Sequence, residues 1–178
     1  MQNQNNFDNK DFLRVSNFIK SKVLNFLSTK PRTEHEIISK IRYVIQNLED
    51  TPLDEKTKKE IEQNILDYLR NIKLLDDAKY AADLVKEKIN SRHPQNKYKI
   101  KQFLLRKKVN PANIESALKL YTNDNERQII EKEIEKKLRT IKDKNPYIIK
   151  SKLLKFLISK GYTYEIVKTV VDSHLDVK

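Results

Sequence analysis

A repeated pattern of apolar residues is the feature that most restricts the fold of this chain. Eight residues between positions 100 and 118 can each be compared with the residue 53 positions later. In seven of these pairs both residues are hydrophobic, and in the eighth both are lysine. The pairs are Ile100/Leu153, Phe103/Phe156, Leu104/Leu157, Lys107/Lys160, Val109/Tyr162, Ile114/Val167, Ala117/Val170 and Leu118/Val171. A shift of 63 likewise places Ile37 and Ile41 on Ile100 and Leu104. This repetition predicts a tandem array of like units, each burying its apolar stripe against its neighbours.

The units are expected to be helical, because their apolar residues recur three and four positions apart. One glycine and five prolines in 178 residues leave little material for tight β-turns. With 35% charged and 38% hydrophobic residues, a thick central core is not expected. We therefore predict an elongated all-α array of three three-helix repeats. The predicted parts are a disordered tail over 1–10 and repeats over 11–73, 74–122 and 123–178.

Local capping signals predict where helices begin and end. In the central run 74–82, Asp76 is a good N-cap and Asp77 adds charge that favours the helix N-terminus. Thr33 with Glu36 forms a capping box. The other predicted signals are Thr51 or Asp54 for the third helix, Asn110-Pro111, Asn123 with Glu126, Asn145-Pro146, Gly161 as a left-handed C-terminal residue, and Thr163. A helix over about 95–108 lies between these signals.

The charge of the chain is large and unevenly spread. The formal net charge is +12, which favours contact with polyanions or an acidic protein surface over an ordinary lysine-rich soluble face. Residues 86–108 and 136–160 each carry nine Lys or Arg against one acid, whereas residues 46–67 carry three Lys against seven acids. The positive charge is therefore concentrated in the second and third repeats.

Several function classes are excluded or disfavoured by composition. Cysteine is absent, so disulfides and thiolate metal sites are excluded. No apolar run approaches the roughly 20 residues that span a bilayer, and residues 1–10 lack an apolar signal core, so we expect a cytoplasmic protein. The three histidines match no metal spacing, and no Gly-rich phosphate loop is present. Capping explains the Asp76-Asp77 pair better than acid/base catalysis does, so we expect a non-enzyme without cofactor or metal.

The run Leu74-Leu75-Asp76-Asp77-Ala78-Lys79-Tyr80-Ala81 resembles the Asp-Asp-x-x-aromatic-Ala motif of the RecX family, bacterial modulators of the RecA recombinase. The likeness extends from about Val15 to Asp172. It includes residues 23–27 followed by 33–37, residues 100–109, and residues 149–162, which resemble the close of the third repeat in that family. Lys73, Lys108 and His93 stand where the family often has glycine, which puts the geometry of those loops in question.

The resemblance implies a function that periodicity alone does not. Members of the family are elongated proteins that lie in the groove of the RecA–DNA filament. They block its extension, favour its disassembly, and inhibit strand exchange and ATP hydrolysis without catalytic residues of their own. The expected partners are therefore the RecA filament and the single-stranded DNA within or near it, with no membrane and with the chain as a monomer.

Basic residues of the last two repeats are the candidate contacts to the filament or its DNA. Lys97, Lys101 and Lys108 fall within about 40° of one another on an ideal helix. They either contact phosphate or form an ordinary solvated face, and the sequence favours neither. The full candidate set is Arg92, Lys97, Lys99, Lys101, Arg106, Lys108, Lys150, Lys152 and Lys155. Lys107 and Lys160 are expected to extend along the edge of the core.

Two further alternatives stay open at this point. Tyr147, Leu154 and Ile158 make a second apolar stripe, which is either a contact between repeats, the favoured interpretation, or a surface for a partner. The chain as a whole could also be a stand-alone nucleic-acid-binding helical repeat protein, because basic helices also dock on duplex backbones.

Overall fold

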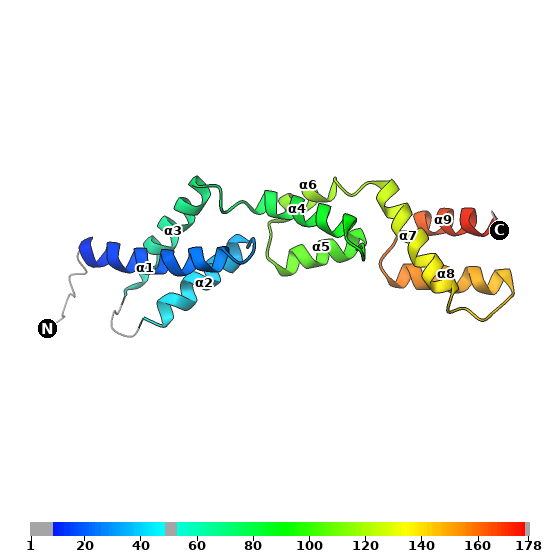
Figure 1. Ribbon diagram of the computed structural model, residues 1–178, viewed down its shortest axis with the longest axis horizontal. Coiled ribbons are helices and arrows are strands. Elements are labelled where there is room, and N and C mark those ends of the chain that lie inside the picture. The colour runs from blue at the N-terminus through cyan, green and yellow to red at the C-terminus, as the bar shows by residue number, and fades with distance from the viewer. Residues whose placement is uncertain (1–8, 49–52, 177–178) are drawn as a thin grey trace. The chain divides into compact units, whose positions relative to one another are not determined.

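The computed structural model describes residues 9–48 and 53–176, and within these ranges it contains helices and no strands (Figure 1). The all-α prediction is confirmed. The helices are α1 (Asn9–Leu27), α2 (Glu34–Gln46), α3 (Glu55–Asn71), α4 (Asp77–Asn90), α5 (Lys97–Arg106), α6 (Pro111–Leu118), α7 (Asn123–Leu138), α8 (Pro146–Ser159) and α9 (Tyr164–Asp176). Residues 1–8 of the predicted tail lie outside the described residues, and Asn9 and Lys10 already belong to α1.

The chain divides into two compact units. Unit 1 takes the described part of residues 1–80 together with 107–109, and unit 2 takes 81–106 together with 110 onward. Unit 1 holds α1, α2, α3 and the first residues of α4, whereas unit 2 holds the rest of α4 and α5 to α9. The boundaries of the three predicted repeats stay a prediction.

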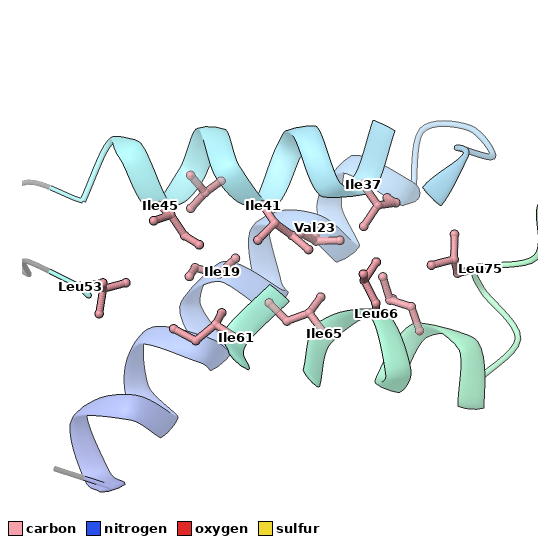
Figure 2. Close-up of a cluster of buried hydrophobic side chains, with 12 residues drawn as sticks. Ile19, Val23, Ile37, Ile41, Ile45, Leu53, Ile61, Ile65, Leu66 and Leu75 are labelled. Carbon is pink, nitrogen blue, oxygen red and sulfur yellow. The ribbon is translucent and has the colours of Figure 1, made fainter. Parts of the chain in front are cut away.

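The core of unit 1 is a layer of branched side chains between three helices. Figure 2 shows Ile37, Ile41 and Ile45 of α2 facing Ile61 and Ile65 of α3, with Ile19 and Val23 of α1 between them. All but Ile45, which is 8% exposed, are fully buried. Burying side chains of this size contributes about 1.5–3 kcal/mol each, so these stripes hold the three helices together.

Burial in the structure follows the repeat pattern of the sequence. In every one of the eight pairs related by the shift of 53, both members fall in the same burial class: six pairs are buried, and the Phe103/Phe156 and Lys107/Lys160 pairs are half-buried. Ile37 and Ile41 are fully buried like Ile100 and Leu104. The shifts therefore relate positions of equal environment as well as equal chemistry.

Most predicted caps are confirmed. Thr33 and Glu36 form a full capping box on α2, and the carboxylate of Asp76 accepts a 2.8 Å hydrogen bond from the Lys79 N–H. Asp54 caps α3, while the alternative Thr51 lies outside the described residues. Asn110 and Asn145 cap α6 and α8 before their prolines.

The boundaries of two helices were predicted wrongly. The capping box of α7 is formed by Thr122 and Asn125, one residue before the predicted Asn123 and Glu126. The short Asn125 amide completes the box, since its oxygen accepts a 3.1 Å hydrogen bond from the Thr122 N–H. The helix expected over 95–108 is the shorter α5, because the Asn96 side chain caps it at one end and Lys108 leaves the helical region at the other.

Lys73, Lys108 and Gly161 have positive φ angles of 57°, 59° and 93°. This left-handed conformation costs roughly 1–2 kcal/mol for residues with a Cβ atom, whereas glycine adopts it freely. The two lysines therefore hold a backbone conformation that glycine adopts at lower cost.

Replacing Lys73 by glycine should raise the free energy of unfolding by about 0.5–1 kcal/mol, because relief of the left-handed strain outweighs the greater entropy of glycine in the unfolded chain. Urea denaturation followed by circular dichroism measures the change. Lys86→Gly, at an exposed position in the interior of α4, is the matched control and should lower the same free energy by about 1 kcal/mol. A loss of stability in both variants would contradict the argument.

Candidate functional site

The N-terminus of α2 is tied to the segment that follows α5. The Thr33 side chain is fully buried, and its hydroxyl donates a 3.0 Å hydrogen bond to the Lys107 carbonyl oxygen. The Glu36 carboxylate accepts from the Thr33 N–H at 3.1 Å and from Lys107 Nζ at 2.7 Å. Burial raises the pKa of Glu36, but the hydrogen bonds from Lys107 and Thr33 outweigh it, so this pKa lies below its ordinary value. Lys107 thus extends along the core edge, as predicted, and ends in an ion pair.

Asp77 has a role that the sequence did not indicate. Its carboxylate accepts a 2.9 Å hydrogen bond from the Glu34 N–H, which joins the first residue of α4 to the first residue of α2. Burial, with the nearby charges of Glu34, Asp76 and Glu36, raises the pKa of Asp77. Asp76 caps the N-terminus of α4, whereas Asp77 holds α4 to α2.

Unit 2 contains an equivalent tie. Asn96 is 4% exposed; its Oδ1 accepts from the Lys99 N–H at 2.8 Å, and its Nδ2 donates to the Lys160 carbonyl oxygen at 2.6 Å. Lys160 Nζ forms an ion pair with Glu133 of α7. The N-terminus of α5 is thereby fastened to the C-terminal end of α8.

The two ties occupy corresponding positions of the repeat. Thr33 and Asn96 are separated by 63 residues, and Lys107 and Lys160 by 53, the same shifts that align the apolar stripes. In both, the N-cap side chain of one helix binds the carbonyl of a lysine one repeat later. Sequence reasoning missed Asn96, because threonine and asparagine do not look alike in a pattern of apolar residues.

The candidate basic residues around α5 fall into three groups. Exposed side chains form the first group: Arg92, Lys97, Lys99 and Arg106. Lys101 is paired with Glu115 at 2.6 Å, which offsets part of its charge. Lys108 lies beyond the last residue of α5 and belongs to unit 1, so its predicted alignment with Lys97 and Lys101 on one helix is wrong.

A hollow of about 740 Å³, here called the α5 hollow, lies beside α5 in unit 2. Two of the predicted residues, Lys99 and Arg106, line it. So do Tyr98, which is 53% exposed, and the amides Gln95 and Gln102. The Arg106 guanidinium lies 5.9 Å from the centre of the Phe103 ring. Cationic, aromatic and amide groups thus surround one cavity, the combination with which proteins bind single-stranded nucleic acid.

The candidate residues of α8 lead to a second cavity. Lys150 is paired with Asp172 at 2.6 Å, Lys152 is paired with Asp143, and Lys155 is exposed. Lys152 and Lys155 line a hollow of about 670 Å³, here called the α8 hollow, to which Lys137 and Lys142 also contribute. Lys137 and Lys142 were not among the predicted contact residues, although the charge of residues 136–160 includes both.

A series of contacts connects the two hollows. Glu133 lines the α5 hollow and forms an ion pair with Lys160, whose Nζ lies 4.5 Å from the centre of the Phe156 ring. Phe156 lines the α8 hollow, and Lys137 Nζ lies 5.1 Å from the same ring centre. Within unit 2, residues from both basic segments therefore reach one network.

The apolar stripe of α8 does not make the contact that was favoured for it. Tyr147 is 85% exposed and Ile158 is 44% exposed, while Leu154 is half-buried. The interpretation as a contact between repeats is therefore wrong for Tyr147 and Ile158 in the described chain. Both side chains remain open to a partner.

No helix within the described ranges is long and apolar enough to cross a membrane. Across the same residues, no three His, Cys, Asp or Glu side chains gather where they could hold a metal ion.

Residues 124–171 match the family model described as RecX, third three-helix domain. The regulatory protein RecX of Clostridium perfringens strain 13 is 30% identical over 166 residues, covering 91% of this chain and 72% of that protein. The RecX regulatory protein of Finegoldia magna is 32% identical over 149 residues, covering 83% and 67%. A crystal structure of a regulatory protein RecX is 26% identical with a TM-score of 0.73, covering 93% of this chain and 78% of that one. The fold is also that of RecX from Lactobacillus salivarius, with a TM-score of 0.76 at 24% identity and coverage of 93% and 99%.

Proposed function

This chain belongs to the RecX family of regulatory proteins, and from that membership we propose that it binds the RecA filament on single-stranded DNA and inhibits its extension, ATP hydrolysis and strand exchange. It acts by binding as a monomer and catalyses no reaction itself. The observation that carries the proposal is the pair of hollows in unit 2, the α5 hollow with Lys99 and Arg106 and the α8 hollow with four lysines. They are linked through Glu133, Lys160 and Phe156. Two neighbouring basic cavities suit a long, shallow contact to a polyanion, and such a contact weakens with salt.

The direct test adds the protein to RecA that is turning over ATP on single-stranded DNA. We expect ATP turnover to fall as protein is added, and the inhibition to weaken as salt is raised. Unchanged turnover at saturating protein would overturn the proposal.

The contact surface is tested by reversing the charges of Lys99 and Arg106, which line the α5 hollow. Lys99→Glu with Arg106→Glu should raise the concentration for half-inhibition by on the order of tenfold or more, because two phosphate contacts become repulsive. Lys56→Glu with Lys59→Glu makes the same change in net charge on exposed positions of α3 and should leave inhibition close to that of the parent. Equal effects of both pairs would mean that net charge, and not the α5 hollow, decides the interaction.

A stand-alone nucleic-acid-binding protein is the second candidate, favoured by the exposed Tyr98 ring between cationic side chains. A gel shift with DNA alone separates the two functions. Tight binding without RecA, together with no effect on its ATP turnover, would favour this candidate.

A further inference from the structure

We propose that the α8 hollow is a binding site for oligophosphate, meaning two or more phosphate groups in a row. The hollow lies between the C-terminal end of α7, the loop 139–145 and α8. Its polar lining includes Lys137, Thr140, Lys142, Lys152, Lys155 and Ser159. The inference rests on the proposed function, which uses the same hollow as a polyanion contact, but its test measures binding by the chain without RecA.

The charge of the lining is strongly positive. Four lysines face one acid, Asp143, which is paired with Lys152. Neither Lys142 nor Lys155 has a carboxylate within ion-pair distance among the described residues, and Lys137 rests over the Phe156 ring. Lysine ammonium groups bind phosphate as point charges, so several of them around one cavity favour several phosphates together.

The hydroxyl groups of the hollow are already engaged. Thr140 donates to the Lys137 carbonyl oxygen, and Ser159 donates to the Phe156 carbonyl oxygen, both at 2.8 Å. The Lys137 carbonyl oxygen also accepts a 2.9 Å hydrogen bond from the Thr140 N–H. The negative C-terminal end of α7 opposes an anion, and the four lysines act against it. Among the side chains of the lining, the flexible ammonium groups are therefore the donors that remain for a ligand, so the site selects charge density over the shape of one small molecule.

The pair between Lys152 and Asp143 does not close the site. Lys152 and Asp143 have side chains that are 49% and 36% exposed, and solvent weakens ion pairs that are exposed to this degree. A phosphate can therefore replace the carboxylate on Lys152 at little cost and recruit it to the other three lysines.

The test compares two double variants of the full chain. Lys142→Glu with Lys155→Glu reverses the two lysines that lack a carboxylate partner. Lys119→Glu with Lys168→Glu makes the same charge change at exposed positions of unit 2 outside the hollow. The probes are a fluorescently labelled oligo(dT), followed by anisotropy at several salt concentrations, and pyrophosphate as its competitor.

We expect the hollow variant to bind oligo(dT) at least about tenfold more weakly and its salt slope to fall by about 1.4, because two phosphate contacts at about 0.7 each are lost. The control variant should keep most of the affinity. If pyrophosphate displaces oligo(dT) from the parent and the control variant but not from the hollow variant, free oligophosphate is a ligand of the site. If oligo(dT) binds and pyrophosphate does not displace it, the site binds the nucleic-acid backbone. Equal losses in both variants, or none in the hollow variant while circular dichroism shows it folded, would overturn the proposal.

Discussion

Replacing Asn96 with alanine should lower the free energy of unfolding of this protein by about 2–4 kcal/mol. Two losses add together. The Lys99 N–H loses its cap acceptor at the start of α5, which costs about 1 kcal/mol. The Lys160 carbonyl oxygen loses the donor 2.6 Å away, and leaving this partly buried acceptor unpaired costs about 1–3 kcal/mol.

Asn110 offers a matched control, because it is also an asparagine N-cap but is exposed. Asn110→Ala should cost only the cap, about 1 kcal/mol. Urea denaturation followed by circular dichroism gives both values. If Asn96→Ala costs no more than Asn110→Ala, the bond to Lys160 contributes nothing to stability, and the fastening of α5 to α8 is wrong.

Replacing Gly161 with alanine should be of similar severity, about 2–3 kcal/mol. The φ angle of 93° is strained for any residue with a Cβ atom. A Cβ atom there would also lie 2.8 Å from Cδ1 and 2.9 Å from Cγ of Tyr98, closer than real carbon atoms approach. The steric contact therefore adds to the backbone strain.

A double-mutant cycle with Tyr98→Ala separates the two causes. Tyr98→Ala removes the ring but keeps Cβ, 3.1 Å from the new Cβ atom, so Gly161→Ala should there cost mainly the backbone strain, about 1–2 kcal/mol. The difference between the two backgrounds measures the contact with the ring. The same cost in both backgrounds would mean that Tyr98, which is 53% exposed, turns away from the new methyl group.

The position of the positive charge in the candidate site could be predicted from the sequence, but the ion pairs that its lysines form could not. Two lysine-rich segments were evident, and Lys99, Arg106, Lys152 and Lys155 of the predicted set do line cavities. The partners of Lys101 and Lys150 lie 14 and 22 residues away in sequence, on other helices. Which lysines are left without an acidic partner, and so can bind a ligand, therefore depends on tertiary contacts that a count of charges does not reveal.

The sequence alone determined what depends on neighbours a few residues away. The apolar spacing and the caps set the helices, and the shifts of 53 and 63 related positions that the structure then showed to be equally buried. Even the left-handed end of α8 could be assigned, since Gly161 is the single glycine.

Only the tertiary structure decided which hydrogen bonds join these helices to one another and where hollows lie between them. The bond from Asn96 to Lys160 spans 64 residues, and the α8 hollow joins the end of α7 to the side of α8. Helix periodicity says which face of a helix is buried, but it carries no information about which distant backbone group that face will meet. The tertiary structure decides this pairing, because leaving a buried polar group without a hydrogen-bond partner costs about as much free energy as a helix cap contributes.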